Sequence, residues 1–136
     1  MKTVAVSGYF TILHKGHIRL FNEAKKLGDK LIVIVNNNDQ QIAKKGKLIH
    51  DTTDIKEVIS HLQMVDEVVI AIDKDKTVCK TLELIKPDIF ENGGDRNKAN
   101  VPEDAVCAKY NIQMVDNVGE GGKVDSSSRL IKDAGL

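Results

Sequence analysis

The chain has 136 residues, with twenty basic and twenty acidic side chains and a formal net charge of zero. A neutral balance argues against a broad nucleic-acid interface, which needs a clustered positive excess, so we expect no nucleic-acid partner. No apolar run approaches the roughly 20 residues of a membrane span, and the start of the chain does not resemble a secretory leader. Two cysteines without metal-ligand spacing suit reduced thiols. We therefore expect a cytoplasmic protein that does not associate with membranes.

Short apolar runs alternate along the chain with segments whose apolar residues recur every three to four positions. The expected strands cover 3–7, 30–36, 67–72, 88–91 and 112–116, and the expected helices cover 17–27, 52–64, 76–86, 102–109 and 126–132. This alternation predicts an α/β fold, a single domain over 1–136 with a Rossmann-like, doubly wound parallel sheet of about five strands and helices on both faces. The polar, basic segment 36–50 is expected to be a loop with one helical turn at most.

Two histidines, His14 and His17, follow the first expected strand and open the first expected helix. A helix N-terminus attracts phosphate through its unpaired N–H groups and its partial positive charge. Gly16, between the histidines, leaves room for a phosphate to approach the backbone. The pattern predicts that the histidines contact a phosphate. The alternative is an ordinary surface helix that begins with two histidines. A metal pair is a third interpretation, but zinc needs three or four protein ligands and no such set is evident, so no metal-binding residues are predicted.

The segment from Ser7 to Ile18, SGYFTILHKGHI, resembles the GxFDxxHxGH signature of the cytidylyltransferase-like nucleotidyltransferases. Further pieces follow in family order at Glu23–Asp29, Leu31–Asn36, Val65–Val69, Lys86–Asp88 and Gly93–Asp95. The resemblance implies that a substrate phosphate attacks the α-phosphate of a nucleoside triphosphate and that pyrophosphate leaves. It implies that His14 and His17 donate hydrogen bonds to the triphosphate and to the transition state, and that Lys47 joins them in catalysis.

The same resemblance implies nucleotide-binding residues in four parts of the chain. They are Gly8, Tyr9, Phe10, Gly16, Lys44, Gly94, Asp95, Ser126, Ser127, Ser128 and Arg129. Each group also has an ordinary structural explanation. The serines suit helix N-caps, the lysines suit a solvated charged loop, and the Gly-Gly-Asp sequence suits a turn.

The resemblance implies Mg²⁺ as a cofactor carried with the triphosphate, CTP as the favoured nucleotide with ATP as the alternative, and a homodimer. The expected acceptor is a small phosphorylated alcohol, polyol or sugar; with ATP, a sugar phosphate or an FMN-type acceptor is the alternative. Thr11 stands where the family usually has Asp, and Ile55 or Lys56 where relatives usually have Arg. These departures support a second hypothesis, a nucleotide-binding module without catalysis.

Overall fold

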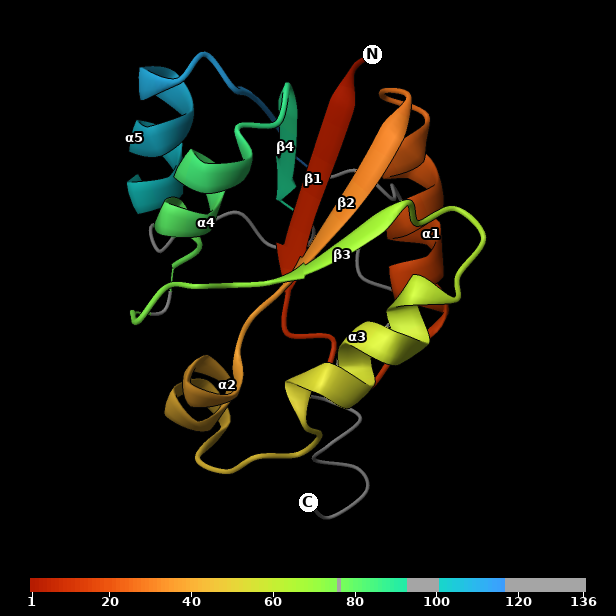
Figure 1. Ribbon diagram of the computed structural model, residues 1–136, viewed down its shortest axis with the longest axis vertical. Helices are drawn as coiled ribbons and strands as arrows, with labels where there is room; N and C mark the ends of the chain where they lie inside the picture. The colour runs from red at the N-terminus through yellow and green to blue at the C-terminus, as the bar shows by residue number, and fades with distance from the viewer. Residues whose placement is uncertain (76, 93–100, 117–136) are drawn as a thin grey trace.

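The computed structural model describes residues 1–75, 77–92 and 101–116, and Figure 1 shows their arrangement. Strands and helices alternate along this part of the chain. In chain order the elements are β1 (Thr3–Gly8), α1 (Lys15–Lys25), β2 (Lys30–Val35), α2 (Asn38–Lys45), α3 (Thr52–Ser60), β3 (Glu67–Ile70), α4 (Cys79–Ile85), β4 (Ile89–Asn92), α5 (Val101–Lys109) and β5 (Gln113–Asp116). In the described ranges no helix is long and apolar enough to cross a membrane.

The five strands form one parallel sheet in the order β3-β2-β1-β4-β5. From β1 the chain moves outward to β2 and β3, then returns across β1 to add β4 and β5. Strand order therefore reverses between β1 and β4, and ligands of such sheets bind at the carboxyl ends of the strands beside that point. The α/β, doubly wound fold predicted from the sequence is confirmed.

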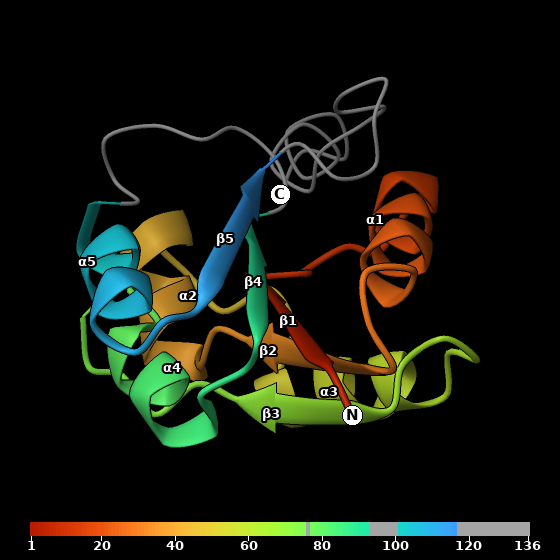
Figure 2. The same cartoon turned by 90° about the horizontal axis from the view of Figure 1, so that it is seen from above.

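Helices cover both faces of the sheet, as Figure 2 shows from above. Alternate residues of β1 face opposite sides: Val4 and Val6 belong to one apolar cluster, and Ala5 belongs to the other. The first cluster includes Phe21 of α1 and residues of α3, and the second includes Leu82 of α4 and residues of α5. Because a parallel strand is buried on both faces, its sequence is a continuous apolar run.

The loop predicted over 36–50 is wrong in its central part, where the structure has the two-turn helix α2. Asn37 caps this helix: its side chain accepts the N–H of Gln40, and the Gln40 side chain accepts the N–H of Asn37. The helix has only one strongly apolar residue, Ile42, so it lacks the apolar stripe by which helices are recognised. The expected helix 126–132 lies outside the described residues.

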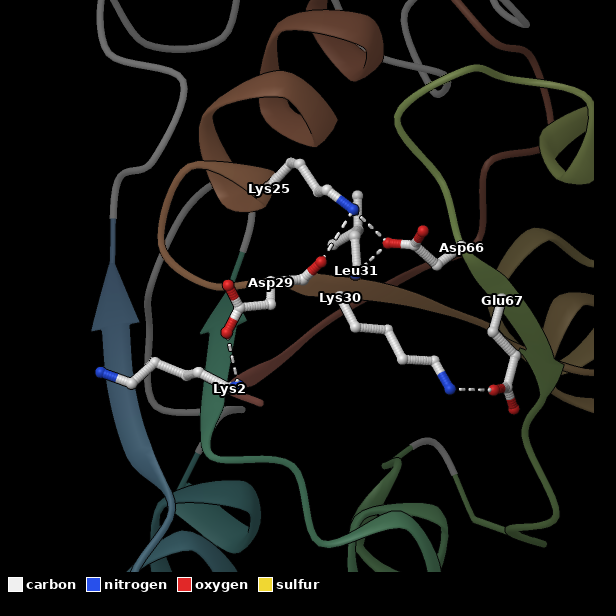
Figure 3. Close-up of polar contacts among 7 residues, drawn as sticks. All are labelled: Lys2, Lys25, Asp29, Lys30, Leu31, Asp66 and Glu67. Atoms are coloured by element: carbon white, nitrogen blue, oxygen red, sulfur yellow. Dashed lines mark hydrogen bonds and ion pairs between the residues drawn. The ribbon is translucent and has the colours of Figure 1, made fainter.

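The amino ends of the strands are tied together by carboxylates (Figure 3). Asp66 accepts the N–H of Leu31 at 2.7 Å and pairs with Lys25. Asp29 accepts the N–H of Lys2 at 2.8 Å. At the next strand Asp88, not drawn there, accepts the N–H of Thr3 at 2.8 Å. These contacts join β1, β2 and the segments that lead into β3 and β4 at the edge opposite the histidines.

Candidate active site

The loop between β1 and α1 has a constrained backbone. Phe10 has a φ of 50°, in the left-handed region that residues other than glycine rarely adopt. Its ring lies against Gly8, where an added Cβ would come within 2.7 Å of the Phe10 ring. The same ring meets His17 edge-on, with 5.1 Å between centroids, and Phe21 at 5.3 Å. Phe10 therefore belongs to the core, and its ring supports the His17 ring through an edge-on contact.

His14 and His17 cap helix α1 reciprocally. The Nδ1 of His14 accepts the N–H of Gly16 at 3.1 Å, and the Nδ1 of His17 accepts the N–H of His14 at 3.3 Å. An Nδ1 that accepts a backbone N–H carries no proton, so a neutral ring must hold its proton on Nε2. The caps therefore make both Nε2 atoms donors, the form required to hold a phosphate oxygen.

The two imidazoles are stacked, with ring centroids 4.0 Å apart and planes 30° from parallel. Burial, with the nearby His14 ring as a smaller cause, lowers the pKa of His17 from 6.5 to about 4. His17 is therefore neutral near pH 7. A neutral ring does not repel a charged neighbour, and its Nε2–H still donates a hydrogen bond. The stacked pair is suited to binding an anion rather than to acid–base catalysis.

Thr11 lies in the same loop and is almost completely buried, with 2% of its surface exposed. Its hydroxyl has no hydrogen-bond partner among the described residues. Burying a hydroxyl group without a hydrogen-bond partner costs free energy. Its place between Phe10 and His14 makes its hydroxyl a candidate hydrogen-bond donor to a ligand. Threonine also carries no negative charge at the position where the family usually has aspartate.

The predicted lysines are arranged unequally around the carboxyl end of β1. The Lys44 Nζ lies 4.5 Å from the centroid of the Tyr9 ring, and the Lys45 Nζ lies 6.0 Å from it. Burial, and then the neighbouring Lys44, lowers the pKa of Lys45. Lys47 is exposed beyond Gly46, which ends α2 in the left-handed conformation. The structure therefore brings Lys44 to the β1 loop through Tyr9, whereas Lys47 is exposed beyond the end of α2.

Helix α2 is held in place by amide side chains. The Gln40 Nε2 donates to the carbonyls of Asp75 at 2.6 Å and Thr77 at 2.8 Å, and its Oε1 accepts from Asn36 and Asn37. These bonds tie the helix to the loop between β3 and α4. They fix the first turn of the helix, whereas Lys44 lies in its last turn. The sequence signal was the Asn-rich run ahead of Gln40, which the apolar pattern does not detect.

The other predicted site residues lie outside the described part of the chain. They are Gly94, Asp95, Ser126, Ser127, Ser128 and Arg129. Gly8, Tyr9, Phe10, Gly16 and the two histidines all lie at the β1–α1 junction. The roles of all these residues, and of Lys44 and Lys47, in binding or turning over the nucleotide remain predictions.

Within the described residues, no three His, Cys, Asp or Glu side chains are grouped so as to hold a metal ion. The described residues therefore form no cage for Mg²⁺. An open cleft of about 420 Å³ is lined by Asn37, Asn38, Asp39, Thr52, Thr53 and Ile70. None of the predicted site residues lines this cleft.

One acidic residue near the carboxyl ends of the strands was not identified from the sequence as a candidate site residue. Glu103 lies in the first turn of α5 and is buried, with 9% of its surface exposed. Burial raises the pKa of its carboxyl group, with Asp104 and Asp75 as smaller causes. Glutamate is common in the first turn of helices, so the sequence did not mark it. Its burial could be read only from the structure.

Comparison with known proteins gives a consistent family. The sequence pattern of the cytidylyltransferase-like family matches residues 5–117. An FAD synthase of Picrophilus torridus is 35% identical over 96% of this chain and 93% of its own. One from Ferroglobus placidus is 39% identical over 71% of this chain and 62% of its own. The bifunctional protein HldE of Blochmanniella floridana is 43% identical over 74% of this chain, which is 21% of that larger protein.

A solved structure has the same fold. The crystal structure of the lipopolysaccharide core biosynthesis protein from Thermoplasma volcanium GSS1 superposes with a TM-score of 0.70. It is 34% identical and covers 85% of this chain and 95% of its own chain. The superposition includes most of the sheet and helices, so the likeness extends well beyond the histidine signature.

Proposed function

Because this chain belongs to the cytidylyltransferase-like family of nucleotidyltransferases, we propose that it transfers AMP from ATP to a small phosphorylated acceptor and releases pyrophosphate. The observation that supports the proposal most directly is the reciprocal cap of His14 and His17. It makes both Nε2 atoms donors at the N-terminus of α1, beside the point where strand order reverses.

The comparisons favour ATP over the CTP that the sequence reading preferred. One relative is named an FAD synthase, and FAD consists of FMN joined to AMP. The sequence also resembles the heptose-phosphate adenylyltransferases of the family. FMN and sugar phosphates each carry a phosphate group that can attack the α-phosphate of ATP. FMN or a sugar phosphate is therefore the proposed acceptor here, in place of glycerol 3-phosphate with CTP.

The reaction needs positioning more than proton transfer. An oxygen of the acceptor phosphate forms a bond to the α-phosphorus, and the bond from that phosphorus to the bridging oxygen breaks, so the electron pair leaves with pyrophosphate. Because the attacking oxygen is already an anion, no general base is required. The Nε2–H groups of His14 and His17 would donate to the triphosphate and to the charge that develops on the α-phosphoryl group.

Lysine charge would complete the binding of two anionic substrates. The contact between Lys44 and the Tyr9 ring holds one cation near the carboxyl end of β1, where the acceptor phosphate must approach. Mg²⁺, proposed to arrive with ATP, would neutralise part of the triphosphate charge when bound. The homodimer predicted from the family stays a prediction.

The experiment is pyrophosphate release, measured with ATP or CTP against FMN, a hexose 1-phosphate and glycerol 3-phosphate. The proposal expects release with ATP and either FMN or the sugar phosphate, and little with CTP. Release with CTP and glycerol 3-phosphate alone would contradict it. Nucleotide binding without release from any pair would favour the module without catalysis that Thr11 suggested.

A further inference from the structure

The carboxyl edge of the sheet holds a second group of side chains on the side opposite α1. Tyr9 follows β1, and the Nζ atoms of Lys44 and Lys45 lie over its ring. Burial raises the pKa of Tyr9, and the nearby Glu103 carboxylate raises it further by a smaller amount. The histidines instead stand at the start of α1, on the other face of the sheet. The edge therefore has two halves: a histidine half, and a half with an aromatic ring, two cations and the Glu103 carboxylate, to which Asp75 and Asp104 are neighbours.

Glu103 has one carboxylate oxygen without a partner. Burial raises the pKa of its carboxyl group, and the backbone N–H groups of Glu103 and Val78 lower it by a smaller amount. Its Oε2 is buried and has no hydrogen-bond partner among the described residues. An acid that only stabilises the first turn of α5 serves equally well in water. Burying it with an open acceptor is costly unless something donates to it.

The chemistry of this half of the edge fits one kind of small molecule. Two ammonium groups suit a phosphate, and a buried carboxylate oxygen suits a hydroxyl proton. The histidine half already accounts for the triphosphate of the nucleotide. A second substrate that binds in the remaining half must present a phosphate and, at its other end, a hydrogen-bond donor.

We propose that Glu103 lies in the acceptor part of the active site and that its Oε2 accepts a hydrogen bond from a hydroxyl group of the phosphorylated acceptor. This inference rests on the proposed function, because it assigns a residue and a selectivity to that site. It selects polyhydroxylated phosphates, a class that includes sugar phosphates and the ribityl phosphate chain of FMN, over simple alkyl phosphates.

Two probes that differ only in hydroxyl groups test the inference without turnover. Binding of glycerol 3-phosphate and of propyl phosphate is measured by calorimetry in the presence of a non-hydrolysable ATP analogue. We expect the wild-type chain to bind glycerol 3-phosphate about tenfold more tightly or better, the range of a hydrogen bond to a charged group. Equal or unmeasurable binding of the two probes overturns the inference.

Two variants locate the selectivity. Glu103→Gln keeps the size of the side chain while an NH₂ group can replace the Oε2, so the preference should fall to within about threefold; Glu103→Ala should do the same. Asp104→Asn removes a neighbouring charge from the same turn of α5 and should keep the full preference. A preference retained in Glu103→Gln and Glu103→Ala overturns the inference. A failure of the proposed function can be told apart from a failure of this inference, because the wild-type chain would then release no pyrophosphate.

Discussion

The two ends of the sheet differ in how their polar groups are used. At the amino ends Asp66 and Asp88 each accept a backbone N–H. Hydrogen bonds lower the pKa of both carboxyl groups. The largest cause is the hydrogen bond from Lys25 for Asp66 and the hydrogen bond from the Thr3 backbone for Asp88. At the carboxyl ends the buried Thr11 hydroxyl and the Glu103 Oε2 have no partner among the described residues. The carboxylates at the amino ends are satisfied, whereas these two groups at the carboxyl ends are left open where a ligand is expected.

This difference separates stability from function within one sheet. Contacts already made in the empty protein contribute to folding. Groups that stay open, together with the unusual backbone of Phe10, reduce stability unless a ligand uses them. Variants of the carboxylates at the amino ends should therefore change the free energy of unfolding, and variants of the open groups at the carboxyl ends should change turnover.

The largest expected effect comes from His14→Asn. Asparagine is a good N-cap, so its side chain can still accept the Gly16 N–H, but it lacks the Nε2–H. We expect turnover to fall by about 10²–10³, as when one transition-state donor is removed, with an unchanged melting temperature. Steady-state kinetics and thermal denaturation check the two parts. Wild-type turnover in this variant would remove His14 from the mechanism.

A matched pair of buried threonines sharpens the comparison. The Thr81 hydroxyl donates to Asp73 at 2.6 Å and accepts the Ile72 N–H at 3.0 Å. Thr81→Val should therefore cost about 1–3 kcal/mol in the free energy of unfolding. Thr11→Val replaces a hydroxyl that has no partner among the described residues, so it should leave stability unchanged or raise it.

Chemical denaturation with urea measures both threonine variants. The Thr11→Val chain should also bind nucleotide or acceptor less tightly, whereas Thr81→Val should not, once correction is made for the fraction folded. A destabilisation of Thr11→Val equal to that of Thr81→Val would show that its hydroxyl is part of the fold rather than of the site.

A smaller effect is expected at the amino edge. Asp66→Asn can still accept the Leu31 N–H but loses the ion pair with Lys25, which is partly exposed to solvent. We expect a loss of about 1 kcal/mol in stability, since exposed ion pairs contribute little, and no change in turnover. Lower turnover at full folding would break the division between the two edges.

The pH dependence of stability should also divide between the edges. Unfolded histidine binds a proton below 6.5, whereas His17 in the fold does so only near a pKa of about 4. The unfolded chain therefore takes up the extra proton in this interval, and His17 makes stability fall as the pH is lowered from 6.5 to about 4. Asp66, whose pKa is lowered in the fold, contributes stability that is lost at more acidic pH.

His17→Gln provides the control for this pH profile. Glutamine at the third helical position can accept the N-cap N–H as His17 does, so the cap is retained. Melting temperatures recorded between pH 4 and 7 should then show a flatter profile than the wild-type chain. An identical slope in both chains would assign the titration to other groups.

The sequence predicted all five strands, because each is an apolar run of strand length between polar turns. It also predicted that His14 and His17 would stand together at a helix start. It failed at α2, since Gln40 and Gln41 hold that helix through amide hydrogen bonds rather than an apolar stripe. Hydrophobic periodicity detects burial of apolar surface, and this helix has little of it.

What the sequence determined by itself is local: strand and helix alternation, the histidine signature and the family that carries it. The tertiary structure decided which groups meet across the chain. It placed Lys44 against Tyr9, buried His17 beside His14 so that its pKa falls and it stays neutral, and buried Glu103 in the first turn of α5. Burial and neighbouring charges set the properties of these groups, and both depend on residues that are distant along the chain and close only in the fold.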